Sequence, residues 1–164
     1  MTLEEFFSEW NNDSERVLVH TSGSTGKPKP MMVEKKRMLN SAHITCDFLG
    51  LQPGDTALLC MSLDYIAGKM VVVRSIERQL QLIAVKPSGH PLSDESLAGA
   101  RISGVKASDS LLVAKGLGTI TSDAKGECDE NITFAAMVPM QVYNTLQVPE
   151  ERERLARIKH LIIG

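Results

Sequence analysis

The chain has 164 residues, of which 43% are hydrophobic and 23% are charged, and its formal net charge is −2. This length allows one domain with a core of its own, and the composition is typical of a soluble globular protein. Because the net charge is so small, no overall electrostatic field favours a nucleic-acid partner or an anionic membrane surface. The sequence also lacks the run of about 18 apolar residues that would predict a membrane span.

The cysteines and the N-terminal residues indicate the cellular compartment in which the protein is expected. Cys46, Cys60 and Cys128 are far apart and odd in number, so they predict neither a disulfide framework nor a zinc site. The acidic start at residues 1–7 lacks the basic and apolar regions of a secretory signal. The histidines show no metal-ligand spacing. We therefore expect a reduced, cytoplasmic protein with no metal ligand in this chain.

In chain order, the first predicted element is a helix that Thr2 and Glu5 begin as a capping box and that extends through Trp10. A short apolar run at residues 16–20 predicts a buried strand. A loop rich in glycine, serine and threonine follows, and residues 33–48 then predict a second helix. Gly50 is placed to end this helix in the left-handed conformation. The apolar stripe of the helix has near-helical spacing and consists of Met38, Ala42, Cys46 and Leu49.

The remaining elements alternate between strands and helices. The predicted strands are residues 57–61, 80–85, 132–137 and 161–163, the first and last of which are expected to be buried. The predicted helices are residues 66–76, 139–146 and 149–159. The charge block at 150–154 is expected to be a solvated helix face. Between 93 and 131 the pattern is weaker: Ser93 is a candidate cap for a short helix, and 111–114 and 119–120 are candidate strands. The alternation predicts an α/β fold with a largely parallel sheet flanked by helices and right-handed crossovers.

The loop after the first strand has the composition of an anion-binding site, and it reads Thr-Ser-Gly-Ser-Thr-Gly-Lys-Pro-Lys from Thr21 to Lys29. Glycine lets the backbone bring N–H groups close to an anion, hydroxyls donate to phosphate oxygens, and lysines supply positive charge. The Walker pattern does not fit, because two residues separate Gly23 from Gly26 and a proline follows Lys27. On composition alone, a flexible surface loop without a ligand is the alternative interpretation.

The order of these nine residues resembles the phosphate loop of the adenylate-forming superfamily, which comprises acyl-CoA synthetases, luciferases and peptide-synthetase adenylation domains. In that family the loop holds the phosphates of ATP while a carboxylate attacks the α-phosphate. The family usually has glycine after the second lysine, where this chain has Pro30. Proline can neither donate a hydrogen bond nor take a positive φ, so this departure affects how the loop can move.

Three further segments resemble the same family. Residues 61–68 are similar to its segment Leu-Pro-Leu-Phe-His-x-x-Gly, with Asp64 at the aromatic position and Tyr65 at the histidine position. Residues 138–143 resemble its strand-to-helix Val-Pro segment, and residues 161–164 resemble the strand that enters its adenine-binding loop. The resemblance spans about residues 15–164 without 93–131. Together with the sequence at residues 33–38, these segments resemble most the short bacterial o-succinylbenzoate–CoA ligases of menaquinone synthesis.

The resemblance implies an ATP-dependent carboxylate–CoA ligase, which joins a small carboxylic acid to coenzyme A through an acyl-adenylate. In that family the Mg²⁺ ligand, the adenine loop and the C-terminal domain lie beyond the position of Gly164. We therefore expect residues 1–164 to be part of the large AMP-binding domain, without the C-terminal domain and incomplete as a catalyst. The implied phosphate contacts are Ser22, Ser24, Thr25, Gly26 and Lys27, supported by Thr21, Gly23 and Lys29. Lys27 is the implied catalytic residue, and Tyr65 and Gly68 are implied in the acyl pocket.

Alternatives stay open for the chain and for single residues. The chain could be a truncated, non-catalytic nucleotide- or phosphate-binding module, or part of a ligase for another acid. Tyr65 could be a plain aromatic at a helix start, and His20 is expected to be the polar end of a strand rather than a substrate contact. Lys69 is expected to be a solvated helix residue rather than an acid-binding group. We expect neither nucleic acid nor a membrane as a partner, and the sequence leaves the oligomeric state open.

Overall fold

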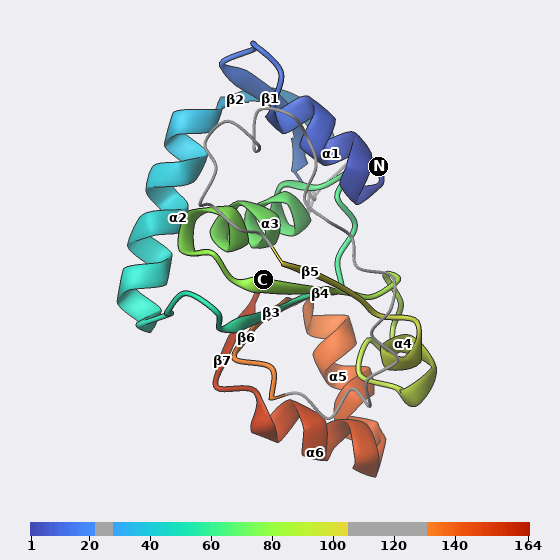
Figure 1. The fold of residues 1–164 in the computed structure, drawn as a ribbon. Coiled ribbons are helices and arrows are strands. Elements are labelled where there is room, and N and C mark those ends of the chain that lie inside the picture. The colour runs from blue at the N-terminus through green and yellow to red at the C-terminus, as the bar shows by residue number, and fades with distance from the viewer. Residues whose placement is uncertain (22–27, 105–130) are drawn as a thin grey trace.

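The computed structural model describes residues 1–21, 28–104 and 131–164, and side chains at 101–104 are left aside. Helices and strands alternate along most of this chain (Figure 1). The helices are α1 (Leu3–Trp10), α2 (Lys35–Leu49), α3 (Ile66–Arg78), α4 (Asp94–Ala98), α5 (Pro139–Gln147) and α6 (Pro149–Arg157). The strands are β1 (Arg16–Thr21), β2 (Lys29–Glu34), β3 (Thr56–Leu59), β4 (Gln81–Ala84), β5 (Arg101–Gly104), β6 (Phe134–Met137) and β7 (His160–Ile163).

The main sheet has the strand order β5-β4-β3-β6-β7. The pairs β3–β4, β3–β6 and β6–β7 are parallel, and β5 adds to β4 in the antiparallel direction. Helices α1, α2 and α3 lie on one side of this sheet, and α5 and α6 lie on the other (Figure 1). The predicted α/β fold with a largely parallel sheet flanked by helices is therefore confirmed.

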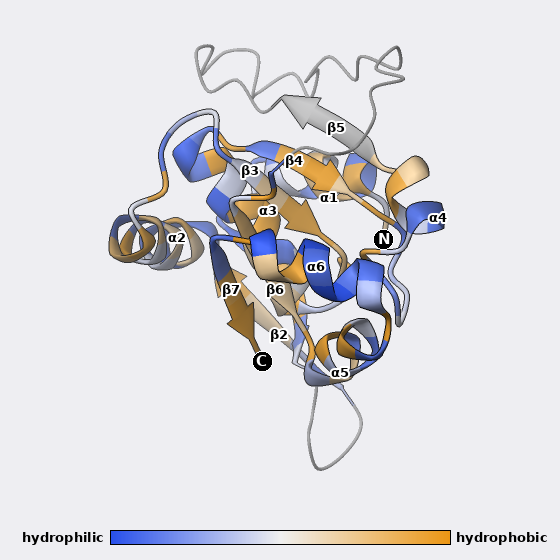
Figure 2. Ribbon diagram, turned by 90° about the horizontal axis from the view of Figure 1, so that it is seen from below, coloured by the Kyte–Doolittle hydropathy of each residue, from blue (hydrophilic) through white to orange (hydrophobic). Residues whose placement is uncertain are grey.

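Each face of the sheet has its own core. Leu82 of β4 packs into a cluster with side chains from α1, α2, α3 and β1, whereas the next residue, Ile83, packs into a cluster with Leu92, Leu97 and Met137. Successive residues of a strand point to opposite faces, so a strand buried on both faces is apolar throughout. Figure 2 shows this as hydrophobic strands in the centre of the molecule.

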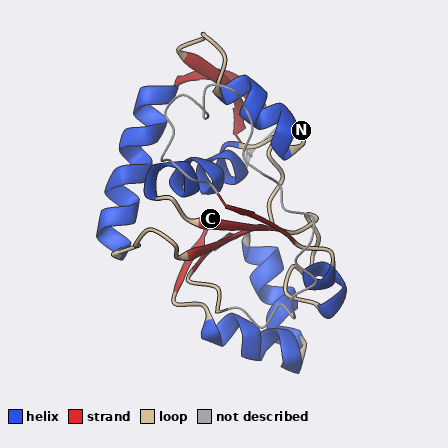
Figure 3. Ribbon diagram, in the orientation of Figure 1, coloured by secondary structure: helices blue, strands red, loops and turns tan. Residues whose placement is uncertain are grey.

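The segment after the glycine-rich loop differs from the prediction. The predicted helix from residue 33 is wrong at its start, because residues 29–34 form β2 and the helix begins at Lys35. β2 pairs antiparallel with β1, and the two form a ribbon apart from the main sheet (Figure 3). Pairing satisfies the backbone groups on the facing edges of β1 and β2, which a solitary β1 could not achieve. The predicted burial of β1 is also only half right, since Val17 and Val19 are buried while Leu18 is exposed.

Other boundaries follow the predicted signals. Thr2 and Glu5 form the expected capping box, Gly50 ends α2 with φ of 64°, and Ser93 caps α4 by accepting a hydrogen bond from the Ser96 N–H. β7 exists as predicted but is only partly buried, with Ile163 about half exposed. β5 was not predicted, and the candidate strands at 111–114 and 119–120 lie outside the described residues.

The charge block of α6 is not a purely solvated face. The carboxylate of Glu151 is buried and lies 3.1 Å from Nδ1 of His90. Arg154 donates to the carbonyl oxygen of Leu92 at 2.8 Å and pairs with Asp94. These contacts hold α6 against the segment that leaves β4, because a buried carboxylate needs a partner inside the fold.

Candidate functional site

The parallel strands bring their carboxyl ends to one edge of the sheet. At this edge the chain leaves β3 at Cys60, β4 at Val85, β6 at Val138 and β7 at Gly164. In open α/β sheets, ligands bind in the crevice outside the carboxyl ends of the strands. This edge is therefore where the predicted site residues should gather.

The two ends of the predicted phosphate loop lie opposite each other. Thr21 ends β1 and Lys29 begins β2, and the two are partners in the antiparallel register. Thr21 is half-buried and Lys29 is exposed. The ribbon therefore delivers a hydroxyl and an ammonium group to the same end. The predicted contacts between them, Ser22, Gly23, Ser24, Thr25, Gly26 and Lys27, lie outside the described residues.

The end of the ribbon contacts the segment that leaves β3. His20 forms a parallel bridge with Tyr65, the residue just before α3. Nδ1 of His20 lies 3.2 Å from the carbonyl oxygen of Asp64, to which it donates in the Nδ1–H tautomer. His20 is thus the polar end of a strand, as expected, and it places Thr21 beside the carboxyl edge.

Asp64 has a local set of partners. Its carboxylate accepts a hydrogen bond of 2.7 Å from the Ser62 hydroxyl and one of 3.0 Å from the N-terminal ammonium of Met1. The Ser62 hydroxyl first, and the ammonium group second, hold the pKa of Asp64 below its ordinary value. Asp64 therefore stays ionised near the start of α3, at the position where the resembling family has an aromatic residue.

Gly68 allows α3 to pass very close to the segment before it. A Cβ built at Gly68 would lie 2.3 Å from the carbonyl oxygen of Ser62. Tyr65 is the residue before the first turn of α3, and its side chain is exposed. The described contacts thus give Gly68 a packing role, and membership of Tyr65 and Gly68 in an acyl pocket stays a prediction.

Gln141 joins three segments at the carboxyl edge and was missed in the sequence. Its buried side chain donates to the carbonyl oxygens of Cys60 at 3.0 Å and Ser88 at 2.9 Å, and accepts from the Val138 N–H at 3.1 Å. It therefore links the exits of β3 and β6 to the segment after β4. A signal existed, because glutamine in the first turn after a proline often bonds back to the backbone.

Lys69 contradicts the expectation of a solvated helix residue. Its side chain is 1% exposed, and Nζ donates to Glu9 at 2.8 Å and to the carbonyl oxygen of Leu18 at 2.7 Å. Nζ also lies 5.6 Å from the centre of the Phe6 ring. The lysine thus joins α3 to α1 and β1. Its sequence position gives no sign of this, because both polar partners are more than 50 residues away.

Two of the buried groups near the sheet are thiols. Burial raises the pKa of Cys60 to about 12 and, together with the nearby Glu77, raises the pKa of Cys46 to about 11. Both cysteines are free thiols, as expected. Thiols with such pKa values are protonated at neutral pH and are poor nucleophiles.

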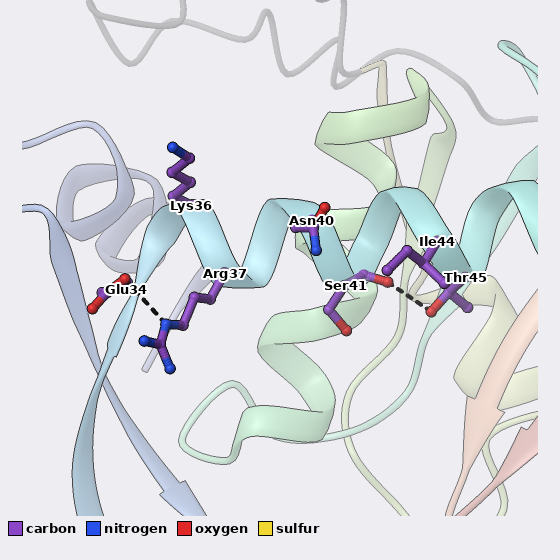
Figure 4. Close-up of a pocket in the computed structure, with 7 residues that line it drawn as sticks. All are labelled: Glu34, Lys36, Arg37, Asn40, Ser41, Ile44 and Thr45. Atoms are coloured by element: carbon purple, nitrogen blue, oxygen red, sulfur yellow. Dashed lines mark hydrogen bonds and ion pairs between the residues drawn. The ribbon is translucent and has the colours of Figure 1, made fainter.

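A shallow hollow lies along α2, away from the ends of the main strands (Figure 4). The described residues that line it come from a single stretch of the chain, and Glu34 and Arg37 pair with each other there. They are Glu34, Lys36, Arg37, Asn40, Ser41, Ile44 and Thr45. This lining contains none of the predicted site residues.

Within the described ranges, no three histidine, cysteine or acidic side chains gather as a metal site would require. No helix in those ranges is both long and apolar enough to cross a bilayer.

The fold is that of the N-terminal domain of adenylate-forming enzymes, and its structural neighbours are AMP-forming acyl-CoA synthetases. The solved structure of an acyl-CoA synthetase (AMP-forming)/AMP-acid ligase II-like protein from Dyadobacter fermentans superposes with a TM-score of 0.69 and 29% identity, over 98% of this chain and 37% of that one. The o-succinylbenzoate CoA synthetase MenE of Bacillus subtilis, in complex with its acyl-adenylate intermediate, matches with a TM-score of 0.54 and 18% identity, over 90% of this chain and 30% of that one. The second likeness is one of fold alone.

One curated relative shares sequence with part of the chain. The 2-succinylbenzoate–CoA ligase of Enterococcus faecalis is 32% identical over 76 residues, which are 46% of this chain and 16% of the relative. No family model matches the sequence. The chain spans well under half the length of the relatives that it matches, so the activity of a whole protein is a matter for proposal.

Proposed function

We propose that residues 1–164 are part of the large domain of an ATP-dependent carboxylate–CoA ligase and supply its loop for the ATP phosphates. The observation that carries the proposal is the position of Thr21 and Lys29, paired at the end of a ribbon whose His20 contacts the segment after β3. That segment leaves the edge of the sheet where α/β enzymes bind ligands. The likeness to an AMP-forming acyl-CoA synthetase supports the same function.

In the proposed reaction, a carboxylate oxygen of the acid attacks the α-phosphate of ATP. The bond between that phosphate and pyrophosphate breaks, and an acyl-adenylate forms. The thiol of coenzyme A then attacks the acyl carbon and releases AMP. The ligands for the Mg²⁺ that accompanies ATP are proposed to lie outside these residues.

The role proposed for the loop is electrostatic and positional. Backbone N–H groups at Gly23 and Gly26 and the neighbouring hydroxyls would hold phosphate oxygens, and Lys27 would neutralise the charge that grows on the leaving pyrophosphate. The hydroxyl donors are Ser22, Ser24 and Thr25, with Thr21 and Lys29 in support. Donors fixed in place before the reaction stabilise the transition state without a cost of reorganisation at that moment.

As the acid we propose o-succinylbenzoate. The support is the partial match to the E. faecalis ligase and the fold shared with MenE. Tyr65 and Gly68 are proposed to border its pocket. Thermal shift of the full-length protein with ATP and a panel of aromatic and aliphatic acids tests this: the largest stabilisation by another acid would exclude o-succinylbenzoate as the preferred substrate.

Replacing the loop lysine tests the proposed phosphate site. In the full-length protein, Lys27→Ala should slow acid-dependent adenylation by about tenfold or more, because the lysine acts on charge that develops in the transition state. Lys159→Ala is a matched control, since Lys159 is an exposed lysine before β7, at the opposite edge of the sheet. Unchanged adenylation kinetics in Lys27→Ala would remove Lys27 from the phosphate role.

A second candidate is a module that binds nucleotide phosphates without catalysis. It would use the same predicted loop at residues 21–29. Acid-dependent exchange of pyrophosphate into ATP distinguishes the two candidates. Exchange by these 164 residues alone would exclude the non-catalytic module. Since ATP and coenzyme A are intracellular substrates, we propose a cytoplasmic location for either form.

A further inference from the structure

The free edge of β1 is covered by side chains and by the start of α3. Both backbone polar groups of Leu18 are bonded by charged side chains: its N–H donates to Glu9 Oε1 at 2.9 Å, and its carbonyl oxygen accepts from Lys69 Nζ at 2.7 Å. Two residues further on, His20 forms its bridge with Tyr65. Residues two apart in a strand present their backbone groups on the same side, so all these contacts lie on the edge of β1 that β2 leaves free.

Glu9 belongs to α1, whereas the other two contacts on this edge, Lys69 and Tyr65, come from the start of α3. Tyr65 and Lys69 are four residues apart, and the Lys69 N–H donates to the Tyr65 carbonyl oxygen at 3.2 Å. Residues at this spacing lie one above the other on a helix face. The first turn of α3 therefore runs along β1 and touches it at Leu18 and at His20, directly before Thr21.

The Glu9–Lys69 pair is enclosed. The lysine side chain is 1% exposed and the glutamate side chain 23% exposed, and Nζ and Oε2 are 2.8 Å apart. Phe6 packs beside the ammonium group, and Trp10 stacks on Phe6 with ring centres 5.7 Å apart. The lysine charge, taken out of water in this way, holds its geometry tightly, because a buried charge is costly without its partners.

We propose that Lys69, together with Glu9, is a positioning residue for the predicted phosphate loop. By fixing Leu18 to α1 and α3, the pair fixes the direction in which β1 delivers Thr21 to the carboxyl edge of the sheet. Lys69 itself contacts backbone and glutamate and has no part in holding the phosphates. The inference rests on the proposed function, since it concerns how the loop is placed for its ligand.

The test compares ATP binding with stability in the full-length protein. Titration of ¹⁵N-labelled protein with ATP, followed through amide shifts, gives the Kd of each variant at a temperature at which that variant is folded. Lys69→Met should raise the Kd for ATP by about tenfold, because binding to a loop that is no longer held in place includes the cost of ordering it. Lys159→Met removes a lysine at the opposite edge and should leave the Kd unchanged.

The double variant Glu9→Gln/Lys69→Met covers the case in which the single variant does not fold. It removes both charges, so it leaves no uncompensated carboxylate in the enclosed site. Its Leu18 carbonyl still lacks the lysine donor, so its Kd for ATP should remain raised. A wild-type Kd in whichever of the two variants is folded, with a lowered melting temperature, would overturn the inference and leave the pair a purely stabilising contact. Absence of ATP binding by the wild-type full-length protein would instead overturn the proposed function, and this inference with it.

Discussion

Gly68 lies at a contact that no other residue type can make without a shift of the backbone. A Cβ there would be 2.3 Å from the Ser62 carbonyl oxygen. Alanine gains about 1 kcal/mol in helix propensity over glycine, whereas overpacking against fixed backbone costs roughly 3 kcal/mol. We therefore expect Gly68→Ala to lower the free energy of unfolding by about 2 kcal/mol, measured by urea denaturation.

Gly99→Ala provides the control for this substitution. A Cβ at Gly99 would meet its nearest atom at 3.7 Å, and the residue has a φ of −90°, which alanine adopts readily. Its free energy of unfolding should stay within about 0.5 kcal/mol of wild type. Equal stabilities of the two variants would mean that the close approach of α3 to Ser62 is not maintained in solution.

Cys60 makes the stability of the fold depend on alkaline pH. Burial raises the pKa of its thiol from 9.0 to about 12, so between these values the unfolded chain loses the thiol proton and the folded chain keeps it. The stabilisation is complete below about pH 9 and is lost as the pH rises towards 12. The loss is about 1.4 kcal/mol for each pH unit above 9. Over this range Cys60→Ala should show a shallower decline in its free energy of unfolding, and parallel profiles would contradict the shift.

At the scale of elements, Gln141 connects the first turn of α5 to the exits of two strands. Gln141→Leu keeps the size of the side chain but leaves the Val138 N–H without its acceptor and the carbonyl oxygens of Cys60 and Ser88 without their donor. A buried unpaired polar group costs about 1–3 kcal/mol, and the bond to the Cys60 carbonyl oxygen is the buried one, so we expect a loss of about 1–3 kcal/mol in chemical denaturation.

Gln147→Leu is the matched control on the same helix. Gln147 is exposed, and its amide donates to the Tyr143 carbonyl oxygen within α5. Its replacement should change the free energy of unfolding by about 0.5 kcal/mol or less. If both glutamines proved equally dispensable, the link between the strand exits would not contribute to stability.

The elements that the sequence predicted well are those with local signals. Thr2 with Glu5, Gly50 and Ser93 specify helix ends through neighbours within a few residues, and the structure has those ends. β2 was missed, and its last two residues were predicted as the start of a helix, because the strand depends on pairing with β1, which lies across the loop. Local patterns cannot report such pairing, since the competing helix satisfies the same backbone groups.

The long-range ion pairs were missed for a related reason. Lys69 and Glu9 are 60 residues apart, and so are Arg154 and Asp94. Only the packing of distant elements brings such partners together and decides that Lys69 lies inside. For the site, the order of residues 21–29 predicts the loop, but the placement of Thr21 beside the exit of β3 depends on the His20–Tyr65 bridge, which no motif encodes.

At the scale of the whole molecule, the two cores are separated by a single layer of strands. Leu82 and Ile83 are consecutive, buried and directed into different cores. We expect Leu82→Ala and Ile83→Ala each to cost about 2–5 kcal/mol and to leave one cooperative transition, because both cores share the same strands.

Trp10 provides the measurement for this expectation. It is the one tryptophan of the chain and belongs to the core that contains Leu82. Its fluorescence should therefore follow the same unfolding curve as far-ultraviolet circular dichroism in both variants. If Ile83→Ala shifted the dichroism curve but left the tryptophan curve in place, the two faces of the sheet would unfold independently.

The central position of β3 has a consequence for synthesis on the ribosome. β3 is followed closely by its neighbour β4, but its other neighbour, β6, comes much later, and Thr56 of β3 meets a residue 77 positions further along the chain. At 5–20 residues per second, that interval takes roughly 4–15 s. For that time the nascent chain exposes one unpaired edge of a strand whose four residues are all buried in the fold, an edge of the kind that promotes aggregation. A chaperone that binds nascent chains would therefore act on this protein mainly during that interval.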